Sequence, residues 1–181
     1  MLNRFLFVAF FAAMLTAPLP AQESFSRKTP SVHMTPAEIT NVTRGKANPV
    51  VLHFHVSDGF HVNSNHPSAE YLIPTALKVE PPTDIAVGRI SYPEGTEMSF
   101  AFAPNEKLSV YTGDFDVTVS VRPLSSVLPS KYGFRGNLRY QACDNAACYP
   151  PKNLPVTFDV KVVKAPPPKA KNPAQSPHAH N

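Results

Sequence analysis

Apolar and polar residues alternate in four stretches of the chain, and this alternation predicts β-strands. Successive side chains of a strand point to opposite faces, so apolar residues at every second position line one face. In the stretch 138–143, Leu138, Tyr140 and Ala142 take the apolar positions, which leaves Cys143 on the polar face. The other three stretches are 50–56, 115–121 and 156–162.

Two weaker strand candidates lie between these stretches, and both are followed by turn residues. Residues 75–79 precede Pro81-Pro82, and residues 87–92 end at Pro93-Glu94-Gly95. No stretch has the period of an amphipathic helix, and the chain contains 21 prolines, each of which would cost a helix interior about 3 kcal/mol. About six or seven short strands separated by turns predict an all-β protein, an antiparallel β-sandwich.

The first residues are typical of a secretory signal peptide. Arg4 is followed by the apolar run 5–15 and then by a short segment that ends at Ala21, where cleavage is expected. An uncleaved anchor is the alternative, but the run is shorter than the roughly 20 residues that a membrane-spanning helix needs. We therefore expect residues 1–21 to be removed and the protein to be periplasmic or secreted, where a disulfide can persist.

The rest of the chain divides into three segments. Residues 22–34 are polar and predict a flexible N-terminal segment, whereas residues 35–163 hold every strand candidate and predict the sandwich domain. Residues 164–181 are rich in proline and lysine and lack periodicity, so we expect a disordered tail. No apolar run after the signal peptide is long enough to span a membrane.

The net charge does not indicate nucleic-acid binding. The formal charge is +4, but its excess comes from the signal peptide and the tail. Without these basic residues the body carries equal numbers of basic and acidic residues, so the net charge is no argument for nucleic-acid binding. The residues concerned are Arg4, Lys164, Lys169 and Lys171.

The only two cysteines, Cys143 and Cys148, are separated by four residues in the segment 140–151. They follow a predicted strand and precede Pro150-Pro151, so they belong to a strand end or hairpin loop. A bridge across such a short loop raises the free energy of unfolding by only roughly 2 kcal/mol, whereas a bridge that closes a loop of about 100 residues raises it by nearly 5 kcal/mol. A redox-active disulfide suits this loop, because breaking the bridge would leave the core intact; a structural staple and a metal site remain alternatives.

Histidines are the only further candidate metal ligands. A closed tetrahedral site needs more than two thiolates, and a copper or zinc site built on histidines is conceivable. Histidines on the polar face of a strand are more often simply solvated. The candidates are His53, His55, His61 and His66.

The segment Tyr-Gln-Ala-Cys…Cys-Tyr-Pro-Pro at 140–151 resembles the active-site segment of the N-terminal periplasmic domain of the thiol:disulfide interchange protein DsbD. Residues 51–63 and 109–119 resemble earlier strands of that domain, and the similarity covers roughly residues 35–163. The resemblance implies an immunoglobulin-like sandwich that passes electrons from a membrane donor to thioredoxin-like periplasmic proteins. By position, Cys148 would be the exchanging thiol and Cys143 the resolving one.

The resemblance also implies a shield and a docking rim, and it requires no cofactor or metal. The family covers its disulfide with an aromatic cap, for which Phe100 and Phe102 are the available residues. Tyr149 and Pro150 would form an apolar rim for a thioredoxin-like partner. No thioredoxin-type Cys-x-x-Cys follows in this chain, so the membrane electron donor would be a separate protein.

We therefore expect a thiol-disulfide oxidoreductase that acts as a stoichiometric electron relay through Cys143 and Cys148. Asp144 would raise the pKa values of these thiols if it lies close to them. Two alternatives stay open. One is a non-catalytic protein-binding module with a structural loop disulfide, and the other is a periplasmic copper-binding protein.

Overall fold

The computed structural model describes residues 29–165, and within them every regular element is a β-strand. The predicted signal peptide, part of the predicted N-terminal segment and nearly all of the predicted tail lie outside the described residues. No helix within residues 29–165 has the length and apolar character that crossing a membrane requires.

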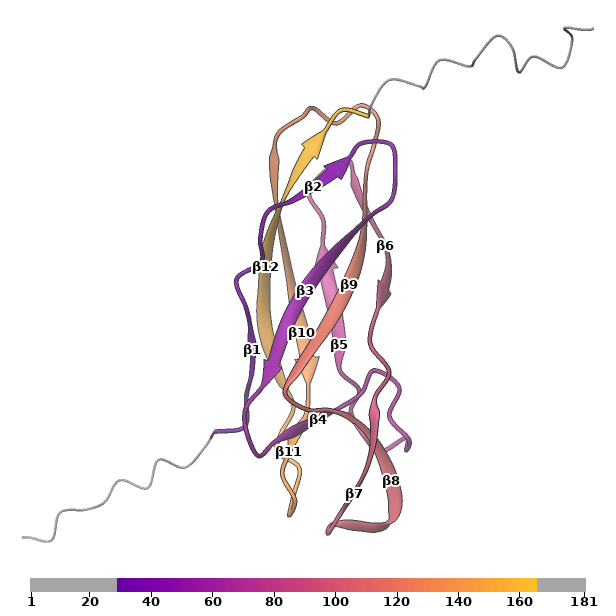
Figure 1. The fold of residues 1–181 in the computed structure, drawn as a ribbon, viewed down its shortest axis with the longest axis vertical. Helices are drawn as coiled ribbons and strands as arrows, with labels where there is room; N and C mark the ends of the chain where they lie inside the picture. Colours follow the sequence, from indigo (N-terminus) through magenta and orange to yellow (C-terminus); the bar gives the residue numbers. More distant parts are fainter. Residues whose placement is uncertain (1–28, 166–181) are drawn as a thin grey trace, which may run out of the picture.

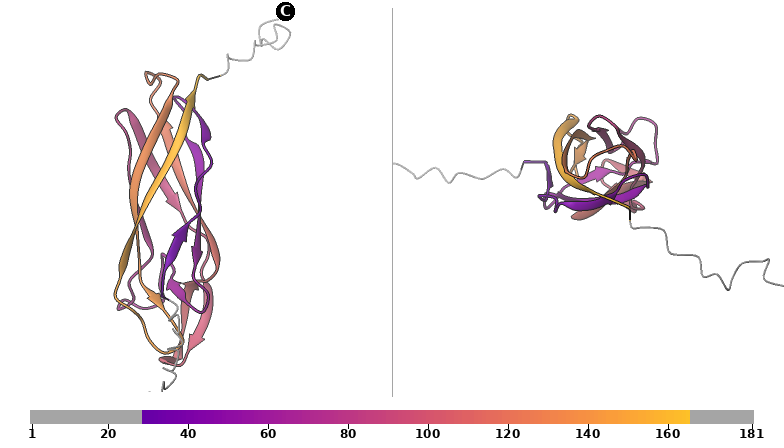
Figure 2. Two further views of the ribbon diagram at one scale, coloured as in Figure 1. Left: turned by 90° about the vertical axis from the view of Figure 1, so that its left-hand side faces the viewer. Right: turned by 90° about the horizontal axis from the view of Figure 1, so that it is seen from above.

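Two four-stranded sheets lie face to face along the length of the molecule (Figures 1 and 2). The first has the order β1-β3-β9-β6, with β1 Val32–Met34, β3 Asn48–Val56, β9 Asp114–Pro123 and β6 Ile85–Ser91. The second has the order β2-β12-β10-β5, with β2 Thr40–Thr43, β12 Lys152–Val163, β10 Lys131–Tyr140 and β5 Ala76–Glu80. All pairs in both sheets are antiparallel except β2 with β12, which is parallel.

The core between these sheets follows from the alternation in the sequence. On β3 and β9 the apolar positions are buried, and the register sets Leu52 opposite Val117 and Phe54 opposite Phe115. The second sheet contributes Phe134 and Phe158, whose rings stack with centroids 4.7 Å apart. Apolar faces of two sheets that pack in this way exclude water from both. The predicted all-β, immunoglobulin-like antiparallel β-sandwich is confirmed, with the parallel β2 as an addition.

The sheet begins before residue 35, where the sequence predicted the domain to start. Val32, in the segment 22–34 that we expected to be flexible, is 2% exposed and pairs with Val56 of β3. Its backbone N–H also donates to the hydroxyl of Tyr140 at 3.3 Å. A three-residue strand carries too little alternation to be recognised, and its order comes from these long-range contacts.

A third, smaller sheet closes one end of the sandwich, at the bottom of Figure 1. Its order is β11-β4-β8-β7, with β11 Ala142–Cys143, β4 His61–Asn63, β8 Ala103–Tyr111 and β7 Thr96–Phe100. This end sheet has a small core of its own, formed by Leu72, Phe100, Ala103, Leu108 and Val110. Both cysteines therefore lie at the end of the molecule, outside the main core.

Candidate redox site

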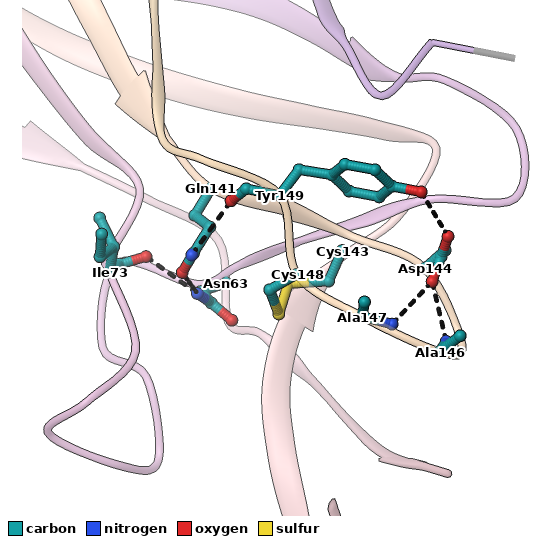
Figure 3. The surroundings of a disulfide bond; sticks show 9 residues. All are labelled: Asn63, Ile73, Gln141, Cys143, Asp144, Ala146, Ala147, Cys148 and Tyr149. Carbon is teal, nitrogen blue, oxygen red and sulfur yellow. Dashed lines mark hydrogen bonds between the residues drawn. A yellow bond between two sulfur atoms is a disulfide. The ribbon is translucent and has the colours of Figure 1, made fainter. Parts of the chain in front are cut away.

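Cys143 and Cys148 form a disulfide across a tight hairpin (Figure 3). The S–S distance is 2.03 Å and the Cα atoms are 3.9 Å apart, because the two residues face each other as an antiparallel bridge. Backbone hydrogen bonds of 2.9 Å flank them, from Asp144 N–H to the carbonyl of Ala147 and from Tyr149 N–H to the carbonyl of Ala142. The hairpin thus has its own ladder, independent of the sulfurs.

Asp144 organises the turn of this hairpin. Its Oδ1 accepts hydrogen bonds from the backbone N–H groups of Ala146 and Ala147 at 2.8 and 2.9 Å, and its Oδ2 accepts one from the Tyr149 hydroxyl at 2.7 Å (Figure 3). The Tyr149 hydroxyl, followed by the two N–H groups, lowers the pKa of this carboxyl below its usual range. A negative charge is therefore fixed one residue from Cys143.

The two cysteines differ in exposure. Cys143 is completely buried, whereas Cys148 is exposed. The alternation along 138–143 placed Cys143 on the polar face, and this prediction is wrong. The long strand β10 ends at Tyr140, and the chain then joins the end sheet as β11, where Ala142 and Cys143 are both buried. Only Cys148 is presented to a partner from outside.

Strand β4 and its surroundings tie the hairpin to the scaffold. Ala142 pairs with Val62, and Cys143 pairs with His61. The Asn63 side-chain amide donates to the backbone carbonyl of Ile73 at 3.0 Å and to Oε1 of Gln141 at 3.4 Å. Gln141 in turn donates to the backbone carbonyl of Tyr149 at 3.2 Å (Figure 3). Both arms of the hairpin are therefore held by side chains outside it.

An aromatic stack is built on His61 in the end sheet. The ring of His61, the cross-strand neighbour of Cys143, stacks on Phe100 with centroids 3.8 Å apart and planes 15° apart. Phe102 continues the stack, 5.5 Å from Phe100. Phe100 is 6% exposed at the end of β7, and Phe102 follows it in the turn before β8. The structure thus brings both predicted cap residues to His61, the cross-strand neighbour of Cys143.

On the other side of the hairpin, Tyr149 packs edge-on against Phe60, with ring centroids 5.9 Å apart. Tyr149 is half-buried, whereas Pro150 and Pro151 are exposed. Of the two residues predicted to form a docking rim, Tyr149 is held by packing and Pro150 lies at the surface.

His61 is the site residue whose position the sequence reasoning missed. It is 3% exposed, and its Nε2 is buried without a hydrogen-bond partner. Burial lowers its pKa from 6.5 to about 4, against the opposing charge of Asp144, so the ring is neutral at neutral pH. The local sequence marked His61 as a candidate metal ligand; its place opposite Cys143 is not visible there, because it depends on the pairing of β4 with β11.

The four candidate metal ligands do not converge. His53 and His55 lie on β3 and contact Asp116 and Asp114 of β9, at 2.6 and 2.7 Å. His61 is buried in the end sheet, and His66 is exposed beyond it. Across residues 29–165, no group of three or more His, Cys, Asp and Glu side chains could hold a metal ion.

One family model matches more than half of the chain. The family model described as thiol:disulfide interchange protein DsbD, N-terminal, matches residues 31–160. No curated protein sequence matches the chain.

Several solved structures are similar to the chain. The DsbD N-terminal domain of Neisseria meningitidis in the reduced form is 21% identical, with a TM-score of 0.40 over 63% of this chain and 77% of that chain. The same domain in complex with the PilB N-terminal domain is 22% identical, with a TM-score of 0.37 over 61% of this chain and 73% of that chain. The SrpA adhesin of Streptococcus sanguinis is 14% identical, with a TM-score of 0.37 over 76% of this chain and 60% of that chain.

Proposed function

The chain belongs to the family of the N-terminal domain of the thiol:disulfide interchange protein DsbD, and on that premise we propose that it relays reducing equivalents between thiol proteins through Cys143 and Cys148. The observation that carries the proposal is the asymmetric disulfide itself. An exposed sulfur and a buried one are joined across a hairpin that keeps its own hydrogen bonds.

The exchange reaction assigns a different role to each cysteine. In the reduced protein, the Cys148 thiolate attacks one sulfur of a partner disulfide and releases the other as a thiol. Cys143 then loses its proton, attacks the Cys148 sulfur of the mixed disulfide and displaces the reduced partner. Two electrons and two protons pass to the partner, and the Cys143–Cys148 bond is restored. The burial of Cys143 suits a thiol that meets only Cys148.

The scaffold allows this bond to open and close without unfolding. The bridge spans a sequence separation of five residues, so it constrains little of the unfolded chain. The main core lies between the two large sheets and includes neither sulfur. The hairpin is held by the Asp144 and Gln141 hydrogen bonds as well as by its own backbone. These contacts support a disulfide used for chemistry more than one used as a staple.

Aromatic residues would control access to the bridge. Phe100 and Phe102 stack on His61, the cross-strand neighbour of Cys143, and would there exclude small thiols and oxidants from the bridge. Tyr149 and Pro150, on the side of Cys148, would form the docking rim. The partners we propose are thioredoxin-like proteins, with a separate membrane protein as the electron donor after export by the predicted signal peptide.

The protein would act as a stoichiometric relay and would need no bound cofactor, because thiol-disulfide exchange moves the electron pair through sulfur bonds alone. In this sense it is an oxidoreductase whose substrates are other proteins. Docking, more than an acidic thiol, should set the rate, since the segment 140–151 contains no lysine, arginine or histidine to lower a thiol pKa.

Exchange with a thioredoxin-like dithiol tests this proposal. The oxidised protein is mixed with a reduced thioredoxin-like protein or with reduced glutathione at the same thiol concentration, and free thiols are counted by alkylation and mass spectrometry. We expect fast reduction by the protein dithiol and slow reduction by glutathione. No exchange with the protein dithiol, together with a potential well below about −300 mV, would indicate a structural staple instead.

A further inference from the structure

The buried Nε2 of His61 lacks a partner in the oxidised protein, and such an atom is costly. His61 is 3% exposed, so water does not compensate for the missing hydrogen bond. An unsatisfied buried polar atom costs free energy comparable to a lost hydrogen bond. A change of state that supplied a partner would therefore be favoured.

The location of His61 identifies the group that could become this partner. His61 on β4 and Cys143 on β11 are directly opposite in an antiparallel pair, so their side chains lie on the same face of the end sheet. Both are buried. The imidazole ring stacks on Phe100, with centroids 3.8 Å apart. This stacking restricts rotation of the ring toward another hydrogen-bond partner.

Reduction changes what Cys143 offers to this nitrogen. In the disulfide its sulfur carries no hydrogen, whereas in the dithiol it becomes an S–H donor. We propose that Nε2 of His61 accepts a hydrogen bond from the Cys143 thiol once the disulfide is reduced, and that His61 thereby shifts the redox equilibrium toward the dithiol. The inference rests on the proposed exchange function. It makes His61 a positioning residue that raises the redox potential of the Cys143–Cys148 pair.

A protein dithiol supplies the two electrons and two protons for the reduction that His61 would favour. One partner thiolate attacks Cys148, and the Cys143 sulfur leaves and takes up the proton of the attacking thiol. The second partner thiol then displaces Cys148, which takes up the other proton. The Cys143–Cys148 bond is reduced and the partner dithiol is oxidised. The hydrogen bond to His61 forms only on the product side.

Both groups are in the protonation states that this hydrogen bond requires. Desolvation holds the imidazole neutral at neutral pH, which leaves a nitrogen lone pair available. Cysteine is mostly a thiol at pH 7, so the reduced Cys143 has a proton to donate. Phe100 and Phe102, on the stacked side, contribute no charge.

The redox equilibrium constant tests this assignment directly. Wild-type protein, His61→Phe and His66→Phe are each equilibrated with a thioredoxin-like dithiol of known potential at pH 7, and the reduced fraction is measured by thiol alkylation. His61→Phe keeps a stacking ring without the nitrogen, and we expect its equilibrium to shift about fivefold to tenfold toward the disulfide, or about 20 to 30 mV. His66→Phe, at an exposed histidine, should match wild type. Equal potentials in wild type and folded His61→Phe would overturn the inference.

A measurement on the wild-type protein covers the case in which His61→Phe does not fold. The ¹⁵N resonance of His61 Nε2 is recorded in the oxidised and reduced states at pH 7, with His66 as the internal control. We expect a change at His61 and none at His66, whereas an unchanged His61 resonance would contradict the hydrogen bond. If wild type exchanges with the dithiol but shows neither the potential shift nor the resonance change, only the role of His61 is refuted. If wild type does not exchange at all, the proposed function is refuted.

Discussion

Reduction of the Cys143–Cys148 disulfide should lower the free energy of unfolding by about 2 kcal/mol while the native fold persists. The magnitude follows from the sequence separation of five, because the chain-entropy relation for a loop of about six residues gives roughly 2 kcal/mol at 25 °C. The hairpin retains its two backbone hydrogen bonds of 2.9 Å, and the main core contains neither sulfur. Neither the hairpin nor the main core should therefore lose further stability on reduction.

Urea unfolding of the oxidised and reduced protein measures this difference. The chain contains no tryptophan, so the transition is followed by far-UV circular dichroism and tyrosine fluorescence. The m-value should be the same in both states, since m depends on the surface exposed by unfolding. A double variant with Cys143→Ser and Cys148→Ser, exposed to the same reductant, controls for effects of the reagent.

The reasoning would be refuted by a loss above about 4 kcal/mol, which is the range expected for bridges that close long loops. A lower m-value in the reduced state would refute it as well, because the reduced native state would then be partly unfolded. Either result would make the disulfide a structural staple.

Three further predictions concern the residues around the bridge. Phe100→Ala should lower the free energy of unfolding by about 3 kcal/mol and should speed reduction of the disulfide by glutathione. Phe102→Ala, which removes the half-buried outer ring of the stack, should have smaller effects on both. Equal rates of reduction by glutathione in wild type and Phe100→Ala would exclude a shield. Because the folded-state pKa of His61 is about 4 rather than 6.5, the unfolded chain binds the proton first, so stability falls as pH drops from 6.5 to 4. Between pH 6.5 and 4, the free energy of unfolding from urea titrations should fall by about 3 kcal/mol more in wild type than in His61→Phe. An equal fall in the two proteins would contradict the burial of a neutral ring. Asp144→Asn should lower the pKa of the Cys143 thiol in the reduced protein, followed by thiolate absorbance, because a neighbouring negative charge is removed; an unchanged or higher thiol pKa would be evidence against that effect.

The sandwich could be predicted from the sequence because its strands are long and buried on one side. On β9, for example, Phe115, Val117, Val119 and Val121 are all buried while the alternate positions face outward, so local alternation matches the burial. The end sheet offers no such pattern. In β7 only the last residue, Phe100, is buried, and β8 has four exposed residues in succession. These strands owe their conformation to pairing, which a local pattern does not record.

The site was predictable in part. The cysteine spacing and the aromatic pair were visible in the sequence, and the structure brings Phe100 and Phe102 to His61, which pairs with Cys143. The burial of Cys143 was not predicted, because the alternation that began on β10 stops when the chain changes sheets after Tyr140. The position of His61 depends on contact between residues far apart in the sequence.

The central claim is that Cys148 exchanges with a partner and Cys143 resolves the product. The most direct test is to trap the mixed disulfide. Single variants Cys143→Ser and Cys148→Ser are each reduced and mixed with an oxidised thioredoxin-like protein, and covalent complexes are identified by non-reducing gel electrophoresis and mass spectrometry. Cys143→Ser should accumulate a mixed disulfide through the exposed Cys148, and Cys148→Ser should form little or none. A mixed disulfide formed mainly through Cys143, or none with either variant, would contradict the account.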